Sequence, residues 1–515
     1  MTFTLALFHA SFYFVCLFLP YLLICASYRV LLHPLRALPG PLLAKLTDCY
    51  GGWHAICKRT HLNIHENHTR YGSVVRYGPD RLLFNSPQAV QDIYQSPNFT
   101  KSYLYVFSRL GGGSSIFSTM DKSHHRQKRH LYAQALSDRS MRLFEPTLLR
   151  HLDVFLKMLL QSSKAQSHVD MTTSCQYLGF DVVGSLAFGA QLNLQTEEKN
   201  RVLLTLLIAA KTQANILMHL PAYRFLNPIL QALPSKQRDL FKSALTDVVK
   251  ARKAQVDTKD DLYALLSAPE NENMFDSLVG ELVFFMTAGG TPPATTICAL
   301  CFYLVRSPEC YEALAQEIRT TFSTGEDIRS GTQLSSCKYL RACIDESMRI
   351  NPPSLATLWR EQAPDVHGSV FVDGQFVPKG TQVGINIYAL HHDEEYFPDP
   401  FAFKPERWLE SSTAEENSAR SRSQKAFVPF IVGPRACAGK ATLYLEVSIA
   451  VAKMLWYFDF KSAPGQLGEV GEGVAGSAHG RHHVNEFQMF DVFNSHHQGP
   501  NLVFKARDGY YSELL

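Results

Sequence analysis

The most informative ten residues of the chain are Phe430-Ile431-Val432-Gly433-Pro434-Arg435-Ala436-Cys437-Ala438-Gly439. They place Cys437 directly before a helix-like run over residues 440–455. A cysteine at a helix N-terminus has its thiolate stabilised by the helix dipole and by free backbone amides. Glycines let a flat cofactor approach the backbone, and an arginine can pair with a carboxylate of that cofactor. The pattern predicts a metal-ligating thiolate at Cys437, although a single thiol is more often a small buried hydrophobe.

The composition of the chain sets the class of protein. Of its 515 residues, 46% are hydrophobic and 19% are charged, which is enough apolar surface for a sizeable core and excludes wholesale disorder. Lys and Arg number 50 against 47 Asp and Glu, and this even balance argues against a nucleic-acid partner. The chain has 11 cysteines, but at this length a disulfide scaffold is not expected.

The N-terminal segment predicts a membrane anchor. No Asp, Glu, Lys or Arg precedes Arg29, and residues 3–28 are dominated by apolar side chains. A bilayer core is spanned by a helix of about 20 residues, and the positive n-region of a cleaved signal peptide is missing. The first positive charges follow the span, which places the body of the chain in the cytosol by the positive-inside rule. A buried core helix is the alternative interpretation.

The remaining chain predicts one large domain. We expect an anchor over residues 1–28, a Pro-rich connector over 29–45 and a single α-rich domain with small sheets over 46–515. Two polar or Gly-rich stretches, residues 411–425 and 464–483, are expected to be loops. The amphipathic pattern predicts helices near residues 88–94, 143–160, 200–214, 238–254 and 311–322, and short strands near 73–77, 82–85 and 369–377.

Four motifs together resemble those of the cytochrome P-450 family of heme-thiolate enzymes. The segment Phe-x-x-Gly-x-Arg-x-Cys-x-Gly is matched at every fixed position, and three further motifs occur in the order of that family. The likeness extends from the connector to Arg507 and is strongest to filamentous-fungal microsomal members of secondary metabolism. The three further motifs are His125-Arg126-Gln127-Lys128-Arg129, Glu346-Ser347-Met348-Arg349 and Pro405-Glu406-Arg407-Trp408.

This resemblance implies a fold, a cofactor and an activity. The expected fold is mainly α with small β-sheets, the triangular prism of the cytochrome P-450 fold, behind a single N-terminal transmembrane helix. The expected cofactor is heme b, with Cys437 as the axial ligand of the iron. The expected enzyme is a monooxygenase that uses O2 and NADPH-derived electrons, supplied by the flavoprotein NADPH-cytochrome reductase. Its substrate would be a lipophilic secondary metabolite. The enzyme would be located in the endoplasmic reticulum membrane, with its catalytic domain facing the cytosol.

The resemblance also assigns contacts to the heme. Besides Cys437, the heme-binding segment would contribute Phe430, Gly433, Arg435 and Gly439. His125, Arg129 and Arg360 would hold the heme propionates together with Arg435. We expect Arg126 and Lys128 to face outward and to form, with Lys440, a basic patch that steers an acidic reductase.

The Glu-x-x-Arg motif predicts a buried charge network. Glu346 and Arg349 are spaced i,i+3 and lie on one helix face. With Arg407 they would form a network behind the heme, and such networks are better interpreted as fold-specifying than as net stabilising. Alone, the pair would be interpreted as a solvated surface pair.

The predicted central helix, residues 275–305, departs from the family pattern. Thr291 stands where the family has an acid, and Pro292 stands where it has an alcohol. That pair delivers protons in the family, and general acid delivery contributes about 100- to 10,000-fold in typical enzymes. Pro292 and Pro293 cannot donate to the carbonyls of Ala288 and Gly289 and should kink the helix.

Several interpretations of this departure stay open. Water on the freed carbonyls, with Thr291 or Thr295 as catalytic residues, could replace the relay, or a substrate hydroxyl could supply the proton. The same fold could instead run a ring expansion, dehydration or isomerisation, or the prolines could mark only a structural kink. A heme sensor without turnover is a remote alternative. By the resemblance, the regions that would ring a largely apolar pocket are residues 104–117, 206–226, 354–358 and 494–497, and a polyketide, terpenoid or alkaloid is a plausible substrate.

Overall fold

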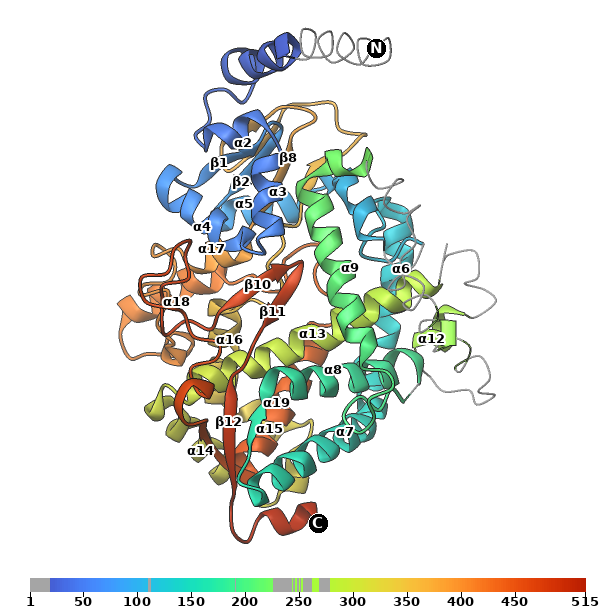
Figure 1. Cartoon of the computed structure of the whole chain (residues 1–515), viewed down its shortest axis with the longest axis vertical. Helices are drawn as coiled ribbons and strands as arrows, with labels where there is room; N and C mark the ends of the chain where they lie inside the picture. The colour runs from blue at the N-terminus through green and yellow to red at the C-terminus, as the bar shows by residue number, and fades with distance from the viewer. Residues whose placement is uncertain are drawn as a thin grey trace, which may run out of the picture.

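The computed structural model describes residues 19–109, 113–189, 191–225, 262–267 and 278–515, together with a few single positions between 243 and 252. The described chain is mostly helical with small sheets, as predicted (Figure 1). The longer helices are α3 (Cys49–Ile56), α4 (Thr60–Tyr71), α5 (Pro87–Tyr94), α6 (Lys122–Ala135), α7 (Asp138–Lys164), α8 (Met171–Phe188), α9 (Val202–His219), α13 (Leu278–Leu304), α14 (Pro308–Thr321), α16 (Lys338–Ile350), α18 (Ala414–Ala426) and α19 (Lys440–Tyr457).

Short helical turns connect these helices. Those used below are η2 (Tyr103–Ser108), which precedes α6, and η6 (Pro405–Trp408), which precedes α18. The other short elements are η1 (Tyr28–Leu32), α2 (Leu42–Leu46), η3 (Pro221–Phe225), α12 (Leu262–Leu266), η5 (Gly325–Asp327), α15 (Thr332–Ser336), α17 (Ile387–His391), η7 (Gly465–Leu467) and η8 (Tyr511–Leu514).

The strands form four small sheets. The largest has the order β1-β2-β8-β5-β3 and pairs segments that are about 300 residues apart, such as Arg81 with Gln382. A three-stranded sheet has the order β4-β12-β9, and β6-β7 and β10-β11 are hairpins. The strands are β1 (Val74–Gly78), β2 (Arg81–Phe84), β3 (Phe99–Lys101), β4 (His168–Asp170), β5 (Arg360–Gln362), β6 (Val370–Val372), β7 (Gln375–Val377), β8 (Gln382–Ile385), β9 (Phe458–Ser462), β10 (Met489–Val492), β11 (Asn494–His497) and β12 (Asn501–Ala506).

Helix α13 runs through the middle of the molecule and contacts α8, α16, α19 and β11 (Figure 1). Glycines permit its close approach to α8. A Cβ atom on Gly290 would lie 2.7 Å from the Phe180 ring, and one on Gly179 would lie 2.4 Å from the Gly290 carbonyl oxygen. The Gly289-Gly290 pair therefore serves helix packing, and α13 is continuous through Pro292 and Pro293.

The C-terminal half of α13 contains a Cys-x-x-Cys spacing, Cys298 to Cys301. Both thiols are free and buried in the hydrophobic core beside Cys175. Burial raises the pKa of both thiols well above the usual range. These side chains therefore pack as small hydrophobes, and the spacing is structural here.

Four of the predicted helices correspond to α5, α7, α9 and α14, whereas residues 238–254 lie almost wholly outside the described residues. The prediction of a loop over residues 411–425 is wrong, because α18 occupies most of it. The Thr413 hydroxyl accepts a hydrogen bond from the Glu416 amide and caps α18. The capped segment is a polar surface helix, in which Ala, Glu, Arg and Lys outweigh its serines.

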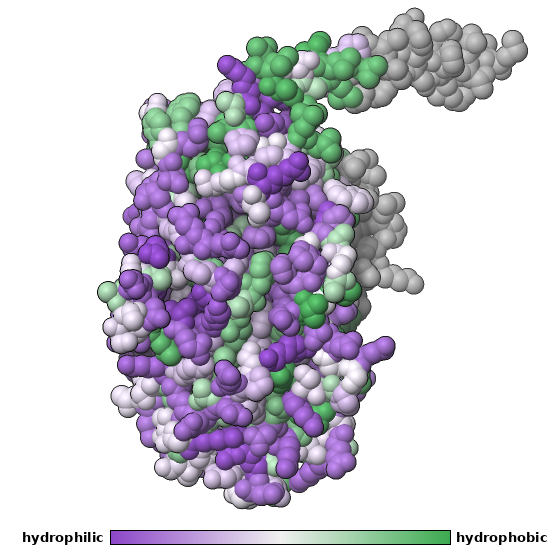
Figure 2. All heavy atoms as spheres, turned by 90° about the vertical axis from the view of Figure 1, so that its left-hand side faces the viewer, coloured by the Kyte–Doolittle hydropathy of each residue, from purple (hydrophilic) through white to green (hydrophobic). Residues whose placement is uncertain are grey.

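An apolar helix over Leu19–Leu32 projects from the body of the protein (Figures 1 and 2). Its Ile24 side chain is 68% exposed, although it belongs to a residue type that is usually buried. Among the described helices, α9 alone is long and apolar enough to cross a membrane by itself, but it packs into the body. Residues 1–18, most of the predicted anchor, lie outside the described residues.

The predicted connector is docked on the body. Leu35 is buried, and the Arg76 amide of β1 donates to the Pro39 carbonyl at 2.7 Å. The Arg76 guanidinium donates to the Arg29 carbonyl at 2.9 Å, and Arg29 in turn donates to the Leu46 carbonyl at 2.5 Å. These bonds fix the direction in which the apolar helix leaves the domain.

Candidate cofactor and substrate site

Cys437 lies in a tight loop just before α19. The Cys437 amide donates to the Phe430 carbonyl at 3.0 Å, and the Ala436 amide donates to the Gly433 carbonyl at 3.0 Å. Gly433 has φ +83°, and a Cβ atom there would lie 2.1 Å from the Tyr94 carbonyl oxygen. Gly433 is thus required by packing against the end of α5, whereas Gly439 lines the cavity described next.

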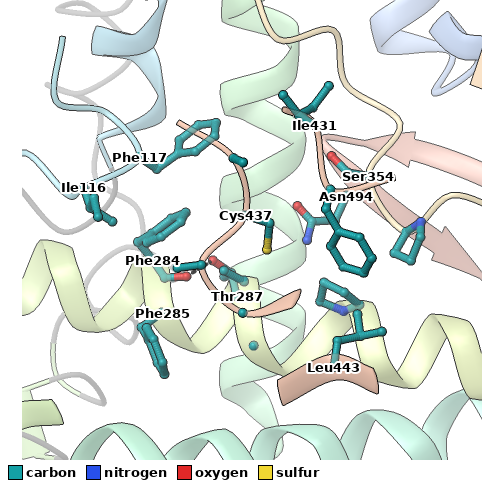
Figure 3. A pocket seen from close by; sticks show the side chains of 18 of the residues that line it. Ile116, Phe117, Phe284, Phe285, Thr287, Ser354, Ile431, Cys437, Leu443 and Asn494 are labelled. Carbon is teal, nitrogen blue, oxygen red and sulfur yellow. Dashed lines mark hydrogen bonds between the residues drawn. The ribbon is translucent and has the colours of Figure 1, made fainter. Parts of the chain in front are cut away.

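The loop forms one wall of a large, mainly apolar cavity of about 1900 Å³, a volume that includes its open mouth. The part of it that water can enter measures about 310 Å³, which lies within the roughly 300–1,000 Å³ of typical ligand pockets. Cys437 is exposed only because its sulfur faces this cavity, as Figure 3 shows. Burial in protein raises the pKa of its thiol, whereas the Gly439 amide, Arg129 and Lys440 act in the opposite direction.

Five basic side chains gather on one part of the cavity wall; we call them the cation cluster. No acid among the described residues forms an ion pair with any of them, and neutral oxygens hold the lysine and the arginines instead. Lys101 donates to the Phe117 carbonyl at 2.5 Å, and Arg435 donates to the Met120 carbonyl at 2.6 Å. The members are Lys101, His125, Arg129, Arg360 and Arg435.

The members of the cation cluster repel one another. Burial, reinforced by Arg435 and Arg360, lowers the pKa of Lys101 well below its usual range. Burial and then Lys101 lower the pKa of His125 to about 2. Burial and then Arg360 lower the pKa of Arg435 to about 10. The cluster is therefore suited to an anionic group that the chain does not supply.

The expectation that Lys128 faces outward is wrong. Lys128 is fully buried, and its ammonium group lies 2.8 Å from a carboxylate oxygen of Glu281, which is also fully buried. The same carboxylate accepts from Tyr132 at 2.6 Å and from the Ile116 amide at 2.9 Å. Arg126 is exposed as predicted. His125, Lys128 and Tyr132 follow helical spacing and share the buried face of α6.

The three residues of the predicted charge network come together on α16 and η6. Arg349 donates two hydrogen bonds to Glu346, both at 2.9 Å, and Arg407 donates a third at 3.1 Å. Trp408, which the sequence did not place in the network, donates to the same carboxylate at 3.0 Å. Burial favours a higher pKa for Glu346, but Arg349 and Arg407 outweigh it and hold this pKa below its usual value.

The two threonines predicted to be catalytic do not line the cavity. Thr295 is fully buried, and its hydroxyl lies 3.0 Å from that of Ser495 on β11. The Thr291 hydroxyl instead accepts from the ammonium group of Lys211 on α9, at 3.2 Å. Because residues of a helix are about 100° apart, Ala288 and Pro292 face the cavity, and Thr291 points toward α9.

Four residues that the sequence did not single out also line the cavity. One of them, Thr287, lies on the same wall as the aromatic residues Phe284 and Phe285 (Figure 3). The four are Lys101, Lys211, Thr287 and Glu446. The regions predicted to ring the pocket contribute Phe117, Ala214, Ser354, Leu358 and Asn494, among others.

Glu446 of α19 is the one of these four with an acidic side chain. It is buried, and its Oε1 atom has no hydrogen-bond partner among the described residues. Burial raises its pKa to about 8. A carboxyl group in this state is protonated near neutral pH and does not balance the cation cluster.

The parts of the site are complementary in their chemistry. A thiol can ligate a metal, the cation cluster can hold carboxylates, and the apolar wall can hold a second, lipophilic molecule. A planar anionic cofactor that carries a metal meets the first two requirements and leaves the apolar wall to a substrate.

Comparisons with known proteins agree with this chemistry. The family model for cytochrome P450 matches residues 43–470. The chain is 34% identical to the cytochrome P450 monooxygenase apf7 of Gibberella fujikuroi, with 94% of this chain and 96% of the relative covered. It is 33% identical to the cytochrome P450 monooxygenase poxM of Penicillium oxalicum (86% and 88% covered). It is 32% identical to the cytochrome P450 monooxygenase AKT7 of Alternaria alternata (95% and 96% covered).

Proposed function

The chain belongs to the cytochrome P450 family and is a heme-thiolate monooxygenase; we propose that it inserts oxygen into a lipophilic secondary metabolite while anchored to a membrane. The electrons would come from NADPH through a flavoprotein reductase, and O2 is the second substrate. The observation that carries this proposal is the cavity in which Cys437 and the cation cluster share one wall with an apolar chamber.

The residues present fit heme b. Its two propionates match a cluster of cations that lacks acids among the described residues. Its metal matches the Cys437 sulfur, which faces the cavity. We propose Cys437 as the iron ligand, with Phe430, Gly433 and Gly439 shaping its loop, and His125, Arg129, Arg360 and Arg435 as propionate contacts, joined by Lys101.

Heme, when bound, supplies the oxygen-activating redox chemistry. The chain's own residues position the reactants. Arg435 and Arg129 would fix the propionate edge, and the aromatic wall of Phe284, Phe285 and Phe117 would exclude water and hold an apolar substrate. The Glu346 network lies outside the cavity and would hold α16 against the segment that leads into the Cys437 loop.

The structure changes the proposed route for protons. Thr295 faces β11 and Thr291 faces Lys211, so neither hydroxyl is placed to bond to a substrate directly. Ala288 and Gly289 line the cavity, and their carbonyls receive no amide hydrogen from Pro292 and Pro293. We infer that these oxygens accept hydrogen bonds from water or from a substrate hydroxyl, with the Thr287 hydroxyl beside them.

A second candidate function follows from Thr291 and Pro292, which replace the acid and the alcohol of the family on α13. Without the acid and alcohol of the family, this wall could support a ring expansion, dehydration or isomerisation. Co-expression with a reductase followed by mass analysis of the product separates the two. A product heavier by one oxygen atom supports monooxygenation, and a product of unchanged mass, or one lighter by a water molecule, supports the alternative.

Membrane attachment at the endoplasmic reticulum, with the domain in the cytosol, is part of this proposal. The exposed apolar helix Leu19–Leu32 supports it. Leu42 and Leu43 of α2, which are 60% and 63% exposed, extend that apolar surface onto the body. Arg126 and Lys440 remain as exposed members of the proposed basic patch for the reductase.

The ligation is tested by replacing the proposed iron ligand. We expect Cys437→Ser to abolish the thiolate-type spectrum of the reduced carbon monoxide complex, because a hydroxyl cannot replace the thiolate. Cys310→Ser, which alters a buried thiol outside the cavity, should keep it. Survival of the spectrum in Cys437→Ser would refute the assignment.

A further inference from the structure

A buried lysine faces the substrate chamber. Lys211 of α9 is only 5% exposed and lines the same cavity as Cys437. Helix α9 runs across α13 (Figure 1), and the Lys211 ammonium group donates to the Thr291 hydroxyl of α13 at 3.2 Å. A lysine is one of the side chains most rarely buried without a charged partner.

Lys128 and Lys453 are also buried, but each has a carboxylate nearby, which Lys211 lacks among the described residues. Lys128 has the Glu281 carboxylate at 2.8 Å. Lys453 donates to the Gly325 carbonyl at 2.7 Å, and Asp153 and Glu513 act on it favourably. Lys211 forms no ion pair among the described residues, and burial alone lowers its pKa to about 8. An unpaired ammonium group in an apolar chamber is destabilising unless a bound anion balances it.

The position of Lys211 separates it from the cofactor contacts. Among the described residues its hydrogen bond is to α13, and Ala214, one turn further along α9, and Pro292 line the same chamber. His496 of β11, whose pKa is lowered by burial, Lys58 and Lys211, is a basic neighbour and supplies no counter-charge. The cation cluster comes from other elements, namely α6, β3, β5 and the Cys437 loop. A cofactor held by that cluster would leave Lys211 to the substrate.

We propose that Lys211 binds a carboxylate of the substrate, so that the chamber selects lipophilic carboxylic acids. This inference rests on the proposed function and adds the substrate class. A single ammonium group balances one carboxylate charge, whereas a phosphate would bring up to two charges and needs more donors than Lys211 alone provides. With its carboxylate held at α9, the apolar part of the substrate would lie along α13 toward Cys437.

The test compares acids with their esters on the heme-loaded enzyme. The probes are saturated fatty acids of 8 to 16 carbons and their methyl esters, and affinity is measured by calorimetry and by spectral titration. We expect the best acid to bind the wild type about 10- to 100-fold more tightly than its ester, as one charge-assisted bond provides. Lys211→Met should reduce that ratio to within about threefold and leave the affinity for the ester unchanged.

The matched control removes a buried lysine elsewhere. Lys453 lies on α19 outside the cavity, and Lys453→Met should keep the preference for the acid. Lys211→Gln serves as a second variant if Lys211→Met does not accumulate. The proposal is overturned if the wild type binds acids no more tightly than esters at every chain length, or if it binds none of the probes. It is also overturned if the preference for acids survives in Lys211→Met.

The two proposals fail separately. The carbon monoxide spectrum and NADPH-dependent oxygen insertion test the proposed function without reference to the carboxylate. An enzyme with the thiolate spectrum and equal affinity for acids and esters would keep the proposed function and lose this inference. Loss of the spectrum in the wild type would overturn the proposed function, while calorimetry would still report on Lys211.

Discussion

Two of the buried charge groups among the described residues, the Glu346 network and the cation cluster, differ in the balance of their charges. In the Glu346 network, one carboxylate receives hydrogen bonds from Arg349, Arg407 and Trp408. In the cation cluster, five basic side chains share one wall of the cavity, and carbonyl oxygens alone hold Lys101 and Arg435. The chain completes the first group by itself and leaves the second incomplete.

This difference separates structure from binding. The Glu346 carboxylate has a pKa below its usual value despite complete burial, so its partners outweigh the cost of desolvation. In the cation cluster the pKa of Lys101, His125 and Arg435 is lowered, so each charge is disfavoured by its surroundings. A balanced buried group holds elements together, and an unbalanced one marks where a ligand of opposite charge belongs.

The largest expected effect comes from breaking the balanced group. Glu346→Gln keeps the size of the side chain but leaves Arg349 buried without its counter-charge. Removing one partner of a buried pair costs about 3–5 kcal/mol of the free energy of unfolding. Urea unfolding followed by tryptophan fluorescence should show this loss.

The matched control for Glu346→Gln lies on the same helix. Arg341 and Asp345 form an i,i+4 pair in which Arg341 is half exposed. Arg341→Gln should cost at most about 1 kcal/mol, since the guanidinium that it removes is half exposed to solvent. Equal losses in the two variants would contradict a structural role for the Glu346 network.

In the cation cluster we expect a smaller effect on stability and a faster loss of heme. Arg435→Gln should accelerate transfer of heme to excess apomyoglobin about 10- to 100-fold, as loss of one charge-assisted bond to a carboxylate predicts. The free energy of unfolding should fall less than in Glu346→Gln, because the repulsion between Arg435 and Arg360 is removed as well. Arg126→Gln, an exposed arginine of α6, should leave heme transfer unchanged; a similar acceleration there would argue against a specific role of the cluster.

The sequence predicted the features that depend on local spacing. Cys437 with its glycines and Arg435, and the pair Glu346 and Arg349, each lie within ten residues of chain, so a motif contains the geometry. The apolar periodicity likewise placed α5, α7, α9 and α14. The loop predicted over residues 411–425 was wrong because a capping threonine and strong helix formers outweighed the serines.

The sequence could not predict features that depend on distant partners. Lys128 can be buried because its ammonium group pairs with the Glu281 carboxylate. Glu281 lies 153 residues further along the chain, so no local pattern reveals this pair. Lys101 is a single residue without a motif, and only the packing of β3 brings it to the cavity. Lys211 lies within the predicted pocket region 206–226, but nothing in the sequence distinguishes it from the other residues of that region. For Thr291 and Thr295, the motif gave the position along α13, but the rotation of the helix depended on its contacts with α8, α9 and β11.

The smallest expected effect is a dependence on pH. The folded-state pKa of His125, about 2, lies below its unfolded value of 6.5, so the unfolded chain binds more protons between these values. His125 therefore contributes a loss of stability as the pH falls below about 6.5. In heme-depleted protein, His125→Gln should flatten this loss by up to about 1.4 kcal/mol per pH unit between pH 6.5 and 5, as measured by unfolding.

His125 and His219 both have lowered pKa values, but only His125 belongs to the cation cluster. Burial, followed by Arg81, lowers the pKa of His219 to about 3, and His219 lies outside the cavity. Propionates of a bound heme would raise the pKa of His125 and leave His219 unaffected. The effect of His125→Gln should therefore shrink in heme-loaded protein, whereas the effect of His219→Gln should stay the same. If both effects were independent of heme, the anion that completes the cation cluster would not be the cofactor.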